Sequence, residues 1–316
     1  MLSIGTLSLI ALGPAAAPPA AAEPALLTPT TIVRGFSQDE GFTLPQGIAF
    51  DPRTGEIVVA DTGRHAIEIF SRSGRGVFRF IHRICREDGT STDGSPVAVA
   101  VDAEGRLYIV DMAASYIDVV DGRGRGIERL TPPAETDAGN PGAVAVTRAG
   151  RILVAMSGDA GRIHCFDRDG SLLRSWGTPG PSPGQLRHVR ALAEAPDGSI
   201  AVLCTDTELA VQRFSAEGTY VDGFARHEIG PGNVSLPSGL VITEDGRLWV
   251  SDELRQTVLV FDNSGRFLRQ VGQMGDAAGA FLYPSAVASD GRERLAVLER
   301  VGARFQLFRL PEEPTQ

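Results

Sequence analysis

The sequence predicts an all-β fold, namely a six-bladed β-propeller of four-stranded antiparallel blades whose ring is closed by an N-terminal strand in the last blade. Three observations predict it. A unit of four short apolar strands recurs along the chain, its last copy stops after three strands, and a spare strand precedes the first copy. A lone four-stranded sheet cannot bury both of its faces, so we expect the copies to pack on one another.

The clearest copy is residues 236–272, LPSGLVITEDGRLWVSDELRQTVLVFDNSGRFLRQVG. Its segment GLVIT is apolar at consecutive positions, as expected for a strand buried on both faces. The turns EDG and NSG lead through RLWVSD and TVLVFD to FLRQV. Arg269 and Gln270 in this last segment indicate a partly solvated edge. The copy therefore runs from a buried inner strand to an outer strand.

Six copies align on the residue that opens each first strand. The openings are Pro45, Pro96, Pro141, Val189, Pro237 and Pro284, spaced by 51, 45, 48, 48 and 47 residues. Second strands follow as EIVVAD, RLYIVD, RILVAM, SIAVLC, RLWVSD and RLAVLE, and third strands as AIEIF, YIDVV, RIHCF, AVQRF, TVLVF and RFQLF. This period is typical of a propeller blade.

The sixth copy ends at Leu310 without a fourth strand, and Thr31–Phe36 (TIVRGF) resembles the outer strands of the other copies. Pairing this segment with the last copy closes a ring, whereas an open solenoid would expose two apolar end faces. We therefore expect the propeller to span residues 31–310, with a linker at residues 23–30 and a tail at residues 311–316.

Residues 1–22 have the pattern of an export signal. The apolar run at residues 2–12 is too short to cross a bilayer, and Ala20–Ala22 supplies small residues for cleavage. No Lys or Arg precedes the run, so a cytoplasmic tail is the alternative. We expect a periplasmic or extracellular protein that does not insert in the membrane after signal removal, with the cytoplasm as the alternative location.

Charge and cysteine content narrow the function classes. The chain has 30 Lys and Arg against 39 Asp and Glu, a net charge of −9, which disfavours nucleic acid and anionic membranes as partners. Cys85, Cys165 and Cys204 are widely spaced and odd in number, so they form neither a disulfide framework nor a metal motif. We expect two or three free thiols, and a single disulfide between two of these cysteines is the alternative.

Two loops between copies, residues 177–186 and 272–281, share the spacing GxxGxxxGx[LF], and strands at residues 44–49 and 236–240 share a Pro-x-Gly opening. The fourth copy departs from that opening at Val189 and Ala191. On these residues the chain resembles the NHL-repeat six-bladed β-propellers over residues 31–310. The resemblance implies the propeller fold. It also implies two activities found in similar proteins, namely metal-dependent lyase or lactonase chemistry in the central channel and RNA binding.

The antiparallel path of each blade brings the start of every first strand and the end of every second strand to one face, which we call the loop-rich face. It collects eight candidate ligand-binding residues: Gln46, Arg190, Ser238 and Ser285 at strand openings, and Asp61, Asp111, Asp252 and Glu299 at second-strand ends. The carboxylates have a structural alternative, because Asp in turns accepts backbone N–H bonds. Arg190 is the cation among the openings, so we expect it to meet the carboxylate ring or an anionic ligand.

We assign no catalytic residue and expect no metal or other cofactor. The five histidines, His65, His82, His164, His188 and His227, occupy different repeat positions and do not converge, although His188 lies near a strand opening. No nucleophile elbow, phosphate loop or HExxH motif occurs in the sequence. Single polar residues without a partner are weak indicators of catalysis.

The sequence favours a monomeric, non-enzymatic binding or scaffold module that takes a protein, glycan or small molecule on its loop-rich face. The alternative is a metal-dependent lyase or lactonase-like hydrolase with its site at the central channel. That alternative requires the four carboxylates to gather on one ion. RNA binding would require a basic face, which the net charge of −9 disfavours.

Overall fold

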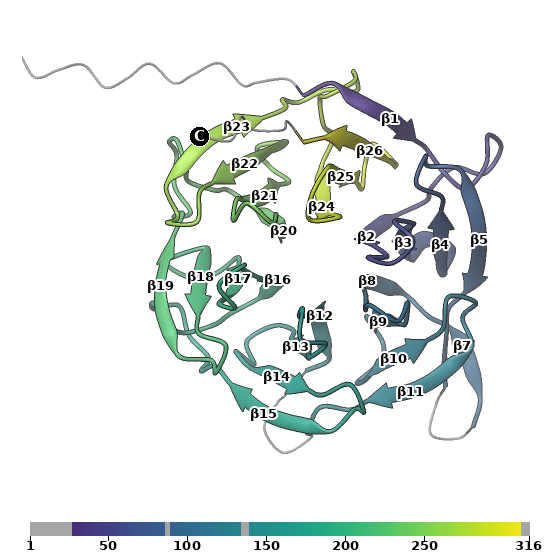
Figure 1. Ribbon diagram of the computed structural model, residues 1–316, viewed down its shortest axis with the longest axis horizontal. Helices are drawn as coiled ribbons and strands as arrows, with labels where there is room; N and C mark the ends of the chain where they lie inside the picture. Colours follow the sequence, from purple (N-terminus) through teal and green to yellow (C-terminus); the bar gives the residue numbers. More distant parts are fainter. Residues whose placement is uncertain (1–26, 86–88, 134–138, 311–316) are drawn as a thin grey trace, which may run out of the picture.

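The computed structural model describes residues 27–85, 89–133 and 139–310 as a ring of six four-stranded antiparallel sheets (Figure 1). This confirms the predicted fold. The predicted signal peptide at residues 1–22, residues 23–26 of the predicted linker and the tail at residues 311–316 lie outside the described residues. In the described part of the chain, no helix is long and apolar enough to cross a membrane.

The strands of the first three blades follow in chain order. Blade one holds β2 (Pro45–Phe50), β3 (Ile57–Asp61), β4 (Ala66–Phe70) and β5 (Gly76–Ile81), with a turn of 3-10 helix, η1 (Thr62–Arg64), after β3. Blade two holds β8 (Pro96–Val101), β9 (Leu107–Asp111), β10 (Ile117–Val120) and β11 (Gly126–Leu130). Blade three holds β12 (Pro141–Val146), β13 (Ile152–Met156), β14 (Ile163–Phe166) and β15 (Leu172–Trp176).

The remaining blades repeat the pattern. Blade four holds β16 (Val189–Glu194), β17 (Ile200–Cys204), β18 (Val211–Phe214) and β19 (Tyr220–Phe224). Blade five holds β20 (Pro237–Ile242), β21 (Leu248–Asp252), β22 (Thr257–Phe261) and β23 (Phe267–Val271). Blade six holds β24 (Pro284–Ser289), β25 (Arg294–Glu299) and β26 (Arg304–Arg309), joined by β1 (Pro29–Val33). All six predicted strand openings are therefore confirmed.

The ring closes where β1 pairs antiparallel with β26, so the last blade takes its outer strand from the N-terminal part of the chain (Figure 1). This strand begins two residues earlier than predicted and ends at Val33 rather than Phe36. It ends there because the chain turns back on itself: Gly35 bridges to Gly41, and the Phe42 amide donates to the Arg34 carbonyl at 3.0 Å. Closure is confirmed, with shifted bounds.

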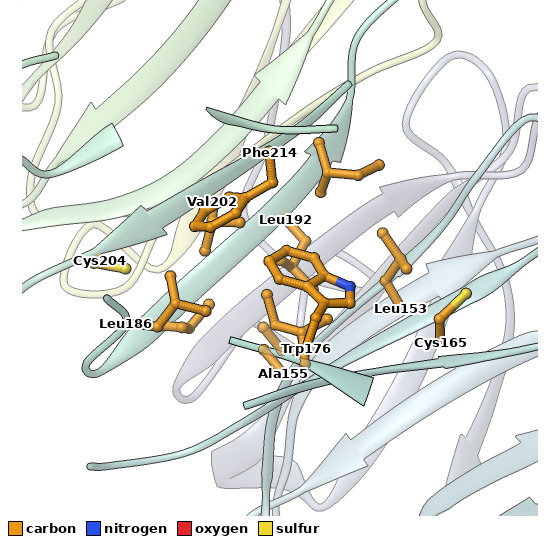
Figure 2. Packing of buried hydrophobic residues seen from close by; sticks show 13 residues of the cluster. Leu153, Ala155, Cys165, Trp176, Leu186, Leu192, Val202, Cys204 and Phe214 are labelled. Atoms are coloured by element: carbon orange, nitrogen blue, oxygen red, sulfur yellow. The ribbon is translucent and has the colours of Figure 1, made fainter. Parts of the chain in front are cut away.

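The core consists of six apolar clusters, one between each pair of neighbouring blades. Figure 2 shows the cluster between blades three and four, where the rings of Trp176 and Phe214 lie 4.7 Å apart. Cys165 and Cys204 are buried in the same cluster as free thiols, and burial raises the pKa of the Cys204 thiol to about 11. The contacts between blades therefore bury both faces of each sheet.

The sequence did not reveal one element. The long loop after β5 contains an extra hairpin, β6 (Arg83–Cys85) and β7 (Ser91–Asp93), which pair antiparallel beside blades one and two. Cys85 lies in this hairpin as an exposed free thiol. The pattern RIC and STD is too short for strand periodicity to indicate a pair.

Candidate functional site

A cavity of about 730 Å³ follows the axis of the ring and is lined by the six inner strands β2, β8, β12, β16, β20 and β24. Each inner strand is the edge of its sheet, so its backbone N–H and C=O groups on the open side have no strand partner. The cavity size is typical of a small-molecule site. The channel therefore offers hydrogen-bonding groups along its wall.

The loops that follow the second strands reach the channel beside the strand openings. Backbone hydrogen bonds hold them there: Met112 N–H donates to Ser95 at 3.1 Å, and Glu253 N–H donates to Leu236 at 2.9 Å. In blade six, Arg300 N–H donates to Tyr283 at 3.0 Å. As a result, Met112, Glu253 and Arg300 line the cavity. We call this end of the cavity the channel mouth; it lies on the loop-rich face.

The four predicted strand-opening residues all line the cavity, but three of them already link neighbouring blades. Ser238 Oγ donates to the Pro284 carbonyl at 2.6 Å, and Ser285 Oγ lies 3.4 Å from the Pro45 carbonyl. Gln46 Nε2 donates to Thr62 Oγ1 at 3.0 Å, and that hydroxyl donates to the carbonyl of Pro96 at 2.6 Å. These side chains therefore join blade five to six, six to one, and one to two.

The four predicted carboxylates lie outside the cavity and stabilise loops, which is the structural alternative. Asp61 accepts from the amides of Thr43 and Leu44, both at 2.8 Å. The other three do the same within their own blades: Asp111 accepts from Ser95 and Ala113, Asp252 from Ser235, Leu236, Leu254 and Arg255, and Glu299 from Leu282. No group of three or more His, Cys, Asp or Glu among the described residues is placed to hold a metal ion.

Among the described residues that line the mouth, the Arg, Asp and Glu side chains are those of Arg190, Glu253 and Arg300. Arg190 is exposed at the second position of β16, as predicted, and it lines the same cavity as Glu253. Arg300 Nη2 lies 2.7 Å from Glu253 Oε2, and the Glu253 side chain is only 4% exposed. Burial raises the pKa of the Glu253 carboxyl, while Arg300 and Arg190 oppose that rise in its pKa. Arg300 thus pairs directly with the buried carboxylate, and the positive charge of Arg190 also favours the ionised form of Glu253.

Sequence reasoning missed Glu253 and Arg300. Each is the residue directly after a second-strand end, Asp252 or Glu299, so a repeat alignment carried one position further brings both to the mouth. The other blades place Thr62, Met112, Ser157 and Thr205 at this position. The signal was available in the alignment, but only the closed ring shows that the position faces the axis.

His188 also lies at the mouth, as its sequence position suggested. Its backbone has a positive φ of 45°, in the left-handed region that non-glycine residues seldom adopt. Its Nε2 is 3.6 Å from Asp159 Oδ1, and both side chains are well exposed. At the opposite end of the channel, Glu194 accepts from the Arg148 amide at 2.7 Å. The two ends therefore differ, with the unbalanced cations at the mouth.

The NHL repeat family model matches residues 42–70, which cover the closing loop, β2, β3 and β4 of blade one. The chain therefore carries an NHL repeat in blade one of a six-bladed β-propeller. A second family model, described as a 6-bladed beta-propeller, matches residues 236–313. The two matches lie in blades that the ring brings side by side.

The chain is 29% identical to Protein brain tumor of Drosophila melanogaster over 137 residues, which are 43% of this chain and 12% of that protein. It therefore spans only a small part of that relative. Among solved structures, a gluconolactonase from Xanthomonas campestris superposes with a TM-score of 0.65 at 18% identity, covering 94% of this chain and 99% of the other. A virginiamycin B lyase from Staphylococcus aureus gives a TM-score of 0.55 at 16% identity, covering 90% and 89%. These structural likenesses show a shared fold.

Proposed function

We propose that this propeller is a non-enzymatic binding module whose channel mouth takes the carboxylate of a small polar molecule. The observation that carries the proposal is that two guanidinium groups, Arg190 and Arg300, line the cavity together with one buried carboxylate, Glu253, in a chain with an overall charge of −9. Arginine is suited to carboxylates because its planar N–H groups bind them in a fixed geometry. The mouth is thus locally cationic on an acidic protein.

The channel wall supports a ligand with hydrogen-bonding groups beyond its carboxylate. Six edge strands present backbone N–H and C=O groups, and an acyl chain would leave those groups without partners. A hydroxyl- or amide-bearing acid can bond to them. The cavity volume of about 730 Å³ fits a molecule of that class.

Calorimetric titration with gluconate tests the proposal, because gluconate carries a carboxylate and five hydroxyls, whereas glucose has comparable hydroxyls and no charge. We expect gluconate to bind and glucose to bind more weakly. Arg190→Ala should weaken gluconate binding by about 1 to 3 kcal/mol, since it removes a charge-assisted contact. Arg75→Ala is the matched control, because Arg75 is exposed in the turn between β4 and β5 on the opposite face. Equal affinity for gluconate in the wild type and Arg190→Ala would contradict the proposal.

A catalytic alternative has one observation of its own. The His188–Asp159 pair beside Arg190 places a group capable of proton transfer at the mouth, and structural neighbours include a gluconolactonase and a lyase. A pH-stat assay of gluconolactone opening, run with and without added divalent metal, separates the two functions. Turnover that His188→Asn abolishes would replace binding by catalysis as the function of the mouth.

A further inference from the structure

The Glu253 carboxylate at the channel mouth depends on the same cations that a ligand would use. Arg300 Nη2 contacts its Oε2 at 2.7 Å from blade six, and Arg190 of blade four lines the same cavity and lowers the pKa of Glu253 by its charge. The Glu253 side chain is 4% exposed, whereas that of Arg300 is 36% exposed and accessible from solvent. An incoming anion can therefore reach the guanidinium of Arg300 while Glu253 stays buried behind it.

The other charges around Glu253 cannot replace those two arginines. Asp252, the preceding residue, is itself negative and adds to the rise in the Glu253 pKa. Its carboxylate is held by four backbone amides and lies 3.8 Å from Arg255 Nε. His188 shares the mouth and is paired with Asp159. A buried carboxylate with weakened cationic partners is costly to keep ionised.

We propose that the mouth binds an anion together with one proton, and that Glu253 is the group that takes up this proton. The inference rests on the proposed function, because it requires an anion between Arg190 and Arg300. The bound anion competes for both guanidinium groups and adds a second negative charge next to Glu253, so the neutral carboxylic acid becomes the favoured form. The proton comes from solvent, and the resulting O–H can donate to an oxygen of the ligand.

Linkage gives the direction of the pH dependence. The free mouth already holds the Glu253 pKa above its ordinary value, and the anion raises this pKa further. Affinity is therefore highest and constant below the pKa of the free site. It falls by up to tenfold per pH unit as pH rises towards the pKa of the bound site, and it levels off above that value.

Titration calorimetry with gluconate at one pH, in HEPES and in Tris, measures proton uptake from the difference in observed heat between buffers of unlike ionisation enthalpy. We expect a measurable uptake of up to one proton per gluconate, and an affinity that falls as pH rises from 5 to 8. Glu253→Gln keeps the size of the side chain and an N–H donor. This variant should bind gluconate with no proton uptake and no fall across that range.

The outcomes separate this inference from the proposed function. Binding that depends on Arg190 but takes up no proton, or still takes one up in Glu253→Gln, overturns the inference and leaves the proposed function intact. Uptake that disappears in His188→Asn instead assigns the proton to His188 and also overturns it. Failure of gluconate, citrate and inorganic phosphate to bind in an Arg190-dependent way overturns both.

Discussion

The middle of the third strand holds a fully buried polar residue in both blade six and blade one, but the two residues are bonded very differently. In blade six, Gln306 Oε1 accepts from the Gly279 amide at 2.9 Å, and its Nε2 donates to the Ala280 carbonyl at 2.7 Å. In blade one, neither oxygen of Glu68 has a hydrogen-bond partner among the described residues, and Arg79 Nη1 lies 3.6 Å away. The loop before blade six therefore satisfies the polar atoms of Gln306, whereas the loop before blade one leaves the Glu68 carboxylate without a hydrogen bond from the described residues.

The difference shows what the glycine-rich loop before a blade does. Gln306 bonds to the loop at residues 272–281, and Gln212 bonds in the same way to the loop at residues 177–186. Each loop presents one amide N–H and one carbonyl, which an amide side chain can satisfy together. A carboxylate only accepts, so Glu68 cannot repeat this arrangement under its own loop at residues 34–42. Burial, with Asp61 nearby, raises the pKa of Glu68 to about 7.

Removing β1 should break this comparison altogether, because blade six takes its outer strand from the other end of the chain, so the pairing of β1 with β26 holds the ring closed. A chain lacking residues 27–33 loses the strand that pairs with β26 and leaves that edge open. We expect the largest effect here: the Tm should fall by more than about 10 °C, or the folded state should be lost. A chain lacking only residues 1–26 is the control. Equal melting of both chains would contradict the role of β1.

Replacing the buried amides sharpens the comparison. Gln306→Leu leaves the Gly279 amide without its acceptor and also removes a 2.8 Å bond to Glu299, a carboxylate that pairs with buried Arg304. We expect a loss of about 2 to 4 kcal/mol in the free energy of unfolding, measured by urea titration. In the described part of the chain, the side chain of Gln212 bonds only to loop backbone and touches no such ion pair. Gln212→Leu should therefore lower the free energy of unfolding by less, about 1 to 3 kcal/mol. The reverse order would show that the ion pair does not depend on Gln306.

Much of the ring could be predicted because it depends on local pattern. Each second strand ends at the predicted residue, and the proline openings mark the first strands, because both recur once per blade. The site could not be predicted to the same extent. The partner of Ser238 is a carbonyl of the next blade, and Glu253 meets Arg300 from another blade, so both contacts depend on how the blades are placed around the axis. The sequence pattern carries no information about that placement beyond the repeat itself.

Glu68→Gln makes blade one resemble blade six at this position and should have the smallest effect, with a sign that depends on pH. Because the folded-state pKa of Glu68 is raised to about 7, its proton stabilises the fold fully below the unfolded pKa, and this contribution is lost as pH rises through 7. The wild type should therefore lose stability between pH 5 and pH 8 through this group. The glutamine cannot ionise, so the variant should gain about 1 to 2 kcal/mol over the wild type at pH 8 and little at pH 5. Urea titrations at the two pH values measure this difference. A gain of the same size at both pH values would mean that the amide had found hydrogen bonds in the loop at residues 34–42, and that the charge of Glu68 was not the cause.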